Sequence, residues 1–199
     1  MIEKEEFYFA SRDGEHKLHA VKWLPETGKP ICILQIIHGM TEHIGRYEDF
    51  ARFMAGKGVL VVGDDHLGHG LSVKDGELYG YFCKDDPATV LVRDEHRLKK
   101  MMQERYPGVP YIILGHSMGS FILRNYLMRY GNGIDGAVIM GTGMQPKRAV
   151  QFGWLQASLL STLFGPKYVC HGMDKALFGV YNLKFQAGPN DSGHWVSVN

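Results

Sequence analysis

The stretch Tyr111-Ile112-Ile113-Leu114-Gly115-His116-Ser117-Met118-Gly119-Ser120 decides the fold that this sequence predicts. Its first four residues are typical of a buried strand, and the residues after Ser120 have the apolar spacing of a helix. A Gly-x-Ser-x-Gly pattern between a strand and a helix is the arrangement of a nucleophile elbow. The sharp turn holds the serine hydroxyl out from the sheet, and the two glycines let strand and helix pass closely. We therefore interpret Ser117 as a nucleophile that faces the N-terminus of the following helix, where amide N–H groups stabilise an oxyanion.

The composition is that of an ordinary globular protein. The chain has 199 residues, enough for one domain with a substantial core, and it is 45% hydrophobic and 22% charged. The net charge of +1 gives no indication of nucleic-acid binding, and no apolar run approaches the ~20 residues of a membrane span. The three cysteines are widely spaced, which argues against a disulfide framework, and the charged N-terminus has no signal-peptide pattern. We expect a cytoplasmic protein.

Strands and helices alternate along the first 140 residues. Short strands are expected at 6–10 and 16–24, followed by nearly continuous apolar runs at 31–37, 59–62, 111–114 and 137–140. Between them, Tyr47, Phe50, Ala51 and Met54 recur at helical spacing, and Asp86-Pro87 begins a second helix. The alternation predicts an α/β fold with a mostly parallel, doubly wound sheet and helices on both faces. Ligand sites in such sheets lie at the carboxyl ends of the strands, where segments 38–40, 65–72, 117–118 and 141–143 fall.

The sequence changes character after residue 144. Phe152, Leu155, Leu159 and Leu163 recur at helical spacing, and a second short apolar run follows at 176–178. We interpret residues 1–145 as the core, 146–185 as a helical lid and 186–199 as a return toward the core. In a lid, Leu155 and Leu159 are candidate substrate-binding residues that line an acyl-chain pocket, and the same apolar surface can contact lipid at a membrane. The alternative is that these side chains pack as core.

Four segments resemble the α/β-hydrolases, in particular the monoacylglycerol lipase and lysophospholipase branch, also described as serine aminopeptidase-like hydrolases. They are HGMTEHIGRYEDFARFMAGKG (38–58), DDHLGHGLS (64–72), YPGVPYIILGHSMGS (106–120) and YN-x-KF (181–185). The resemblance implies that Ser117 accepts the acyl group and that the backbone N–H groups of Met40 and Met118 form the oxyanion hole, with Gly39 beside the substrate. It also implies a serine ester hydrolase that acts on monoacylglycerols, lysophospholipids or other small acyl esters without a cofactor.

Two local departures from the family pattern stand near the expected site. Thr41 occupies a position where some members have glycine, and Leu67 one where arginine is common. The second removes a polar side chain from the surroundings of the site.

The triad acid and histidine of the family follow the lid, after the serine in chain order. No residue before Asn199 matches either, so we expect the strands that carry them to be missing from this chain. Asp174 or Asp191 with His194 has the correct order, but neither acid follows a strand, and Asp135 lies at the amino end of its strand. We therefore expect weak hydrolysis by this chain alone. Three alternatives stay open: an incomplete hydrolase, a non-catalytic protein that binds acyl ligands, and a split enzyme.

Without further strands, the run 137–140 is an apolar edge of the sheet. An unpaired edge presents free backbone donors and acceptors to other chains. We expect it to form a homodimer or to pair with a complementing C-terminal fragment.

The histidines of the expected site loops do not form a recognisable metal motif. His66 and His69 have no helix to align them, and no carboxylate–histidine spacing of a zinc hydrolase is completed. We expect His38, His43, His66 and His69 to shape the loops without binding a metal, and His116 to be structural. Gly141-Thr142-Gly143 lacks the third glycine of a dinucleotide fingerprint and is interpreted as a turn into the lid.

Overall fold

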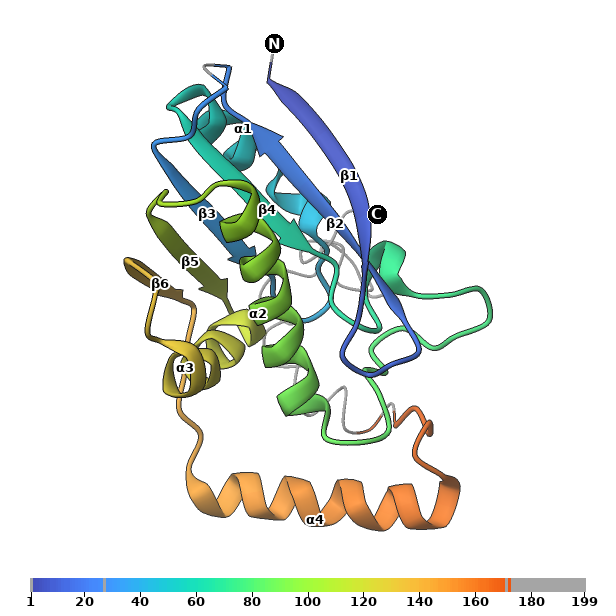
Figure 1. Ribbon diagram of the computed structural model, residues 1–199. Helices are drawn as coiled ribbons and strands as arrows, with labels where there is room; N and C mark the ends of the chain where they lie inside the picture. The colour runs from blue at the N-terminus through green and yellow to red at the C-terminus, as the bar shows by residue number, and fades with distance from the viewer. Residues whose placement is uncertain (1, 27, 171, 173–199) are drawn as a thin grey trace, which may run out of the picture. The chain divides into compact units, whose positions relative to one another are not determined.

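Six strands pair into one sheet in the order β1-β2-β4-β3-β5-β6 in the computed structural model, which describes residues 2–26, 28–170 and 172 (Figure 1). The strands are β1 (Glu3–Ala10), β2 (Lys17–Leu24), β3 (Cys32–Ile37), β4 (Val59–Asp64), β5 (Tyr111–His116) and β6 (Gly136–Met140). β4, β3, β5 and β6 run parallel, whereas β2 pairs antiparallel with β4 and β1 pairs antiparallel with β2. The predicted, mostly parallel sheet is confirmed.

Three helices of the same unit as the sheet cover both of its faces: α1 (Glu48–Gly56), α2 (Pro87–Arg105) and α3 (Met118–Tyr130). A fourth helix, α4 (Lys147–Phe164), follows later in the chain, and short 3-10 turns are found at η1 (Ile44–Tyr47) and η2 (Gly70–Ser72). Alternate residues of β3 point to opposite faces: Ile33 packs with side chains of α2 and α3, while Ile36 packs with those of α1. The two hydrophobic cores therefore lie on opposite sides of one sheet, as the alternating pattern predicts.

Two details of the helices test the sequence pattern. Asp86 caps α2 by accepting a hydrogen bond from the Thr89 N–H at 3.3 Å, and Pro87 occupies the first helical position, as predicted. In α1 the predicted apolar face is largely confirmed, because Ala51 is buried and Tyr47 and Met54 pack against the same core. Phe50 is the exception, since it is 40% exposed while the small Ala55 is buried instead.

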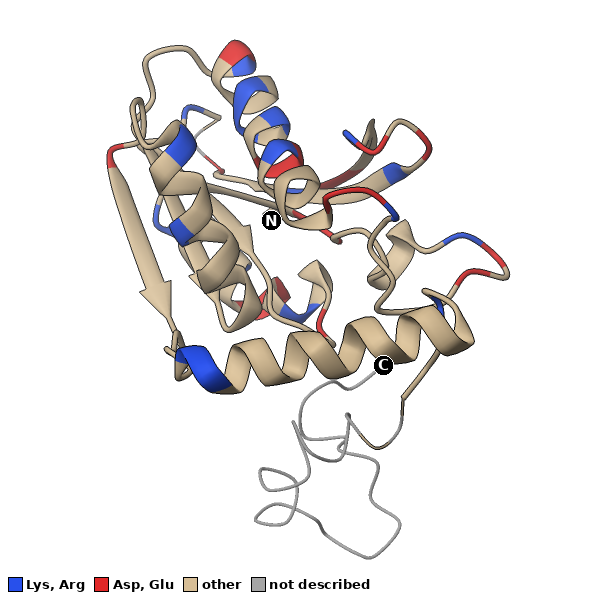
Figure 2. Cartoon of the chain, turned by 90° about the horizontal axis from the view of Figure 1, so that it is seen from below, with Lys and Arg blue, Asp and Glu red and all other residues tan. Residues whose placement is uncertain are grey.

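The chain divides into two units, Met1–Thr142 and Gly143–Asn199. The second unit contains α4, which carries charged side chains only at its start, Lys147 and Arg148 (Figure 2). Leu155 and Leu159 of α4 are both more than half exposed. The predicted run 176–178, the YN-x-KF segment and the return at 186–199 lie outside the described residues, so the lid remains a prediction.

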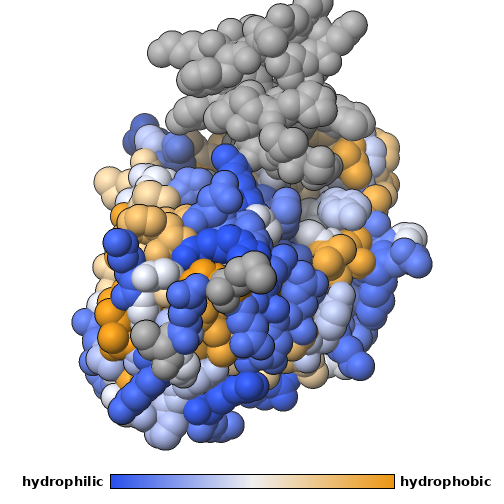
Figure 3. Space-filling model, turned by 90° about the horizontal axis from the view of Figure 1, so that it is seen from above, coloured by the Kyte–Doolittle hydropathy of each residue, from blue (hydrophilic) through white to orange (hydrophobic). Residues whose placement is uncertain are grey.

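The surface and the edge of the sheet bear on the expected partners. Figure 3 shows a face on which hydrophilic side chains predominate and hydrophobic ones form small separate groups. Within the described part of the chain, no helix is long and apolar enough to cross a membrane. Among the described residues β6 pairs with β5 alone, and Val138, Ile139 and Met140 are each more than 40% exposed. The predicted apolar edge is present, and its partner stays a prediction.

The close approach of α3 to the sheet gives a test of the packing. A Cβ added to Gly119 would lie 2.0 Å from the Ile37 carbonyl oxygen, whereas one added to Gly56 would have no neighbour within 4 Å. Gly119→Ala should lower the free energy of unfolding by about 2 kcal/mol or more, because backbone must move. Gly56→Ala should leave it unchanged or raise it by up to about 1 kcal/mol. Urea unfolding of both variants measures the difference, and equal midpoints would contradict the packing.

Candidate active site

Ser117 lies in the turn between β5 and α3 with a strained backbone. Its φ of 52° and ψ of −117° form a conformation that side-chain-bearing residues rarely adopt. The turn is held on both sides, since the Ser117 N–H donates to the Met140 carbonyl at 3.0 Å and the Ser120 hydroxyl donates to the Ser117 carbonyl at 2.6 Å. The predicted strand–turn–helix geometry of a nucleophile elbow is therefore present.

The loop after β3 lies against this turn. A Cβ added to Gly39 would come within 3.1 Å of the Ser117 Cβ, so only glycine leaves this approach free. Met40 and Thr41 follow directly, and Thr41 has a φ of 58°, in the left-handed region that favours glycine. Some family members have glycine at this position, and glycine adopts this backbone conformation more easily than threonine does. Gly39 therefore lies beside Ser117, and Met118 is the first residue of α3. The oxyanion role of the Met40 and Met118 N–H groups stays a prediction.

Glu42 fixes this loop, although no sequence motif indicates such a role. Its carboxylate accepts hydrogen bonds from the Gly39 N–H at 3.1 Å and the Tyr47 hydroxyl at 2.8 Å, and it contacts Arg46 at 3.3 Å. Burial acts to raise the pKa of Glu42, but these donors and His116 hold it below its ordinary value. The only sequence signal was its place inside the segment 38–58. Glu42 is thus a charged support for the Gly39 loop.

The histidines around the loops each have a neighbour, as expected for structural residues. His116 Nδ1 lies 3.1 Å from a Glu42 oxygen and 3.2 Å from the Tyr47 hydroxyl. The ring of His38 stacks on that of His66 with centroids 3.9 Å apart, and its Nε2 accepts the His66 N–H. Burial, together with His66 and His69, lowers the pKa of His38 well below its ordinary value. The low pKa keeps the buried His38 ring neutral, and it acts as a spacer between loops.

Asp65 ties the loop after β4 to three other segments. Its two carboxylate oxygens accept from the Ile44 N–H at 2.7 Å, the Leu71 N–H at 2.9 Å and His19 Nδ1 at 2.9 Å. Leu67, the second departure from the family pattern, is fully buried in the core that α2 and α3 share with the sheet. An apolar contact thus occupies the place where family members carry a charge.

No proton acceptor for Ser117 is in place within residues 2–26, 28–170 and 172. No histidine nitrogen of this part lies at hydrogen-bond distance from the Ser117 hydroxyl, and His116 faces Glu42. Asp135 accepts the Tyr111 N–H at 2.6 Å at the opposite end of β5, as predicted. Asp174, Asp191 and His194 lie outside the described residues. Leu155 and Leu159 belong to the second unit, so their substrate contacts remain a prediction.

The strain at the elbow can be measured by comparing two variants that both remove the hydroxyl. Glycine adopts φ 52° freely and alanine does not, so Ser117→Gly should be more stable than Ser117→Ala by about 1–2 kcal/mol. At the exposed helical residue Lys100 the order should reverse, with Gly about 1 kcal/mol below Ala. Urea unfolding of the four variants gives both differences. If the glycine variant at Ser117 is less stable than the alanine variant, as expected at Lys100, the Ser117 turn is not strained.

The support that Glu42 gives to the Gly39 loop predicts a pH-dependent loss of stability. Glu42→Gln removes the charge that strengthens the bonds from the Gly39 N–H and the Tyr47 hydroxyl, and it turns an NH2 donor toward Arg46 and His116. It should lower the free energy of unfolding at pH 7 by about 2 kcal/mol. Because the folded state holds the pKa of Glu42 below 4.5, its contribution is complete above pH 4.5 and is lost as pH falls through the lower folded pKa. The gap between wild type and variant should therefore narrow in acid. The exposed Glu104→Gln is the control, and a gap of constant size would refute the assignment.

Comparison with known proteins identifies relatives over most of the chain. The family model described as serine aminopeptidase, S33, matches residues 28–191. Human monoglyceride lipase is 39% identical over 115 residues, which are 58% of this chain and 35% of the relative. The monkeypox virus monoglyceride lipase homolog is 32% identical over 141 residues, which are 71% and 49% of the two chains. The chain thus spans between a third and a half of the length of these curated relatives.

Solved structures agree with the fold. A thermostable carboxyl esterase from Bacillus coagulans, crystallised with glycerol, superposes with a TM-score of 0.83 at 29% identity, covering 98% of this chain and 62% of the esterase. An open-form lipase superposes with a TM-score of 0.77 at 26% identity, covering 92% and 59%. The family match, the sheet order and the elbow together establish that this chain belongs to the serine aminopeptidase S33 family of α/β-hydrolases.

Proposed function

We propose that this chain carries the acyl-accepting part of a serine ester hydrolase. The observation that carries the proposal is the strained Ser117 turn, which lies against Gly39 at the start of α3. The names of its relatives, monoglyceride lipases and a carboxyl esterase, support an ester of a fatty acid as the substrate. Monoacylglycerols and lysophospholipids are the substrate classes that we assign.

The proposed reaction is acyl transfer in two halves. The Ser117 oxygen attacks the ester carbonyl, and the alcohol leaves with a proton. Water then releases the fatty acid from the acyl-enzyme. The N–H groups of Met40 and Met118 bind the oxyanion in both halves, and loss of one such donor typically costs about 3–4 kcal/mol of barrier. No cofactor takes part. The apolar side chains Leu155 and Leu159 on α4 line the acyl-chain pocket in this proposal.

The proposal requires a general base that the described residues do not place at Ser117. Residues 173–199, which include Asp174, Asp191 and His194, are one source. A complementing polypeptide that pairs with the β6 edge is the other. The same observation favours a second function, the binding of acyl ligands without turnover. A serine with no base reacts slowly, so a chain whose base comes from a complementing polypeptide should hydrolyse esters several orders of magnitude more slowly without that polypeptide than with it.

Covalent labelling separates hydrolase from binding protein. Where a base is supplied by residues 173–199 or by a complementing polypeptide, a fluorophosphonate probe should add one mass label to Ser117, because phosphonylation needs the same activated hydroxyl and oxyanion donors as acylation. Ser117→Ala should remove the label and the hydrolysis of p-nitrophenyl butyrate, while the exposed helical variant Ser161→Ala should retain both. Peptide mass spectrometry locates the label. Added imidazole should raise the Ser117-dependent rate, measured as the difference from Ser117→Ala.

Two results would overturn parts of this assignment. A folded chain that binds a fluorescent fatty acid but never acquires the label is a binding protein. A wild-type chain with the turnover of a complete lipase already holds its base, and mutation of His194 should then abolish the activity.

A further inference from the structure

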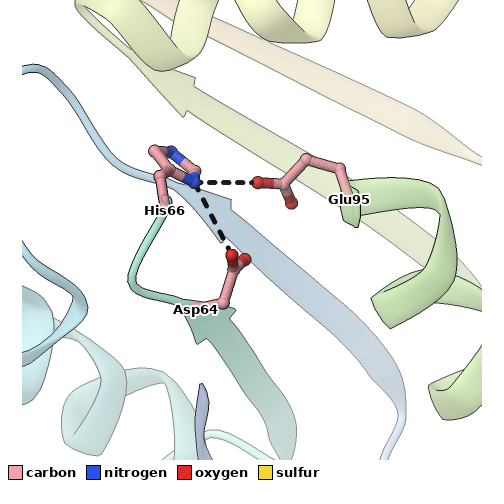
Figure 4. Close-up of side chains that lie close together, drawn as sticks. All are labelled: Asp64, His66 and Glu95. Carbon is pink, nitrogen blue, oxygen red and sulfur yellow. Dashed lines mark ion pairs between the residues drawn. The ribbon is translucent and has the colours of Figure 1, made fainter. Parts of the chain in front are cut away.

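Three buried side chains direct acceptor atoms toward one another beside the site loops (Figure 4). Asp64 ends β4, His66 follows two residues later, and Glu95 projects from α2. Each residue is at most 1% exposed. His66 Nδ1 lies 3.2 Å from Glu95 Oε1 and 3.6 Å from Asp64 Oδ2. The three ligand atoms all lie within 4.8 Å of one another.

The outward-facing atoms of this cluster already have hydrogen-bond partners. His66 Nε2 lies 3.2 Å from the His38 carbonyl, which can only accept, so Nε2 carries the proton of the neutral ring. Glu95 Oε2 accepts from Gln35 Nε2 at 2.5 Å. The Gln35 carbonyl oxygen in turn accepts the Tyr111 hydroxyl at 2.5 Å. The ring tautomer and the carboxylate orientation are therefore fixed from outside.

The inward-facing atoms are acceptors without donors. His66 Nδ1 presents a lone pair, and neither oxygen of Asp64 nor Oε1 of Glu95 receives a hydrogen bond. Burial and repulsion by neighbouring carboxylates raise the pKa of Asp64 to about 7 and that of Glu95 well above its ordinary value, so without a counter-ion these groups hold protons. A single shared proton would satisfy one pair of acceptors and leave the others unsatisfied. A divalent cation would instead bind His66 Nδ1 and one oxygen of each carboxylate, and it would cancel both charges.

We propose that Asp64, His66 and Glu95 bind a divalent transition-metal ion, with zinc as the best match. Tetrahedral zinc with bonds of about 2.1 Å places its ligand atoms about 3.4 Å apart, between the two separations measured from His66. The His66 ring bonded to a backbone carbonyl and the Glu95–Gln35 pair are outer contacts typical of metal ligands.

The site is closed, so its role is structural. A bound ion would join the end of β4 and the loop that begins with Asp65 to helix α2. The histidine spacing alone predicts no metal site here. The proposed site differs because two of its three ligands are carboxylates, and one of these, Glu95, lies on a helix that is distant in sequence. His38 and His69 take no part in binding the ion, although their rings lie beside His66.

Metal content and refolding test the proposal. The chain, produced without a histidine tag in zinc-supplemented medium and passed over a chelating resin, should retain about one zinc per molecule by mass spectrometry of the elements. After unfolding in EDTA, refolding with equimolar zinc should give a higher thermal midpoint than refolding with EDTA. Cobalt should substitute and give the visible absorption of a tetrahedral site.

Variants distinguish the ion from a shared proton. Glu95→Gln should lose the zinc and the zinc-dependent shift in the midpoint, while His43→Gln, which leaves the cluster intact, should keep both. A shared proton predicts instead that wild type holds no zinc and that Glu95→Gln, with a donor in place of the proton, is at least as stable as wild type. If Glu95→Gln does not fold, the comparison of wild type refolded with zinc and with EDTA distinguishes the ion from the shared proton. Less than one tenth of a zinc per chain, with equal midpoints in zinc and EDTA, overturns the proposal.

Discussion

The fit of one helix N-terminus against the sheet is the constraint on which the rest of the site depends. Gly119 places α3 so close to the Ile37 carbonyl that no side chain fits between them. Gly115 meets the Gly119 carbonyl in the same way. With the helix held there, Ser117 has only a strained turn by which to connect β5 to α3. The loop that carries Gly39 then completes the wall of the site. Packing at two glycines therefore determines where a reactive hydroxyl can stand.

The sequence predicts the parts of this arrangement that are local. Apolar runs, glycine positions and the Asp86-Pro87 start of α2 are features of a few consecutive residues, and the structure contains them as expected. On α1 only Phe50 departs from the predicted face, because hydrophobicity alone favours it whereas the small Ala55 faces the sheet. Glu95 has no signal in the sequence, because its neighbours Gln35, Asp64 and His66 lie in other elements. Glu42 is different, since Gly39, Arg46 and Tyr47 are close to it in the chain and only its contact with His116 crosses the fold.

Polar groups beneath the loops act as a framework for the site. Asp65 bonds segments from β2, η1 and η2, and Glu42 holds the Gly39 loop against Tyr47 and His116. Such networks stabilise a single arrangement only when every buried member has a partner. The cluster of Asp64, His66 and Glu95 is the part of this framework whose acceptors outnumber its donors. An ion there would complete the network that supports the loops.

The distribution of function along the chain follows from these contacts. Within the described part of the first unit, the Ser117 turn, the loop beside it and the charged supports are linked by hydrogen bonds and close packing. In the proposed function, a proton acceptor has a different requirement, since it must reach the Ser117 hydroxyl from a segment that comes later in the chain order of this fold. The contacts that place the turn are therefore separate from the contact that a proton acceptor would make with its hydroxyl. In that proposal, the placement of Ser117 and its activation are set by different parts of the fold.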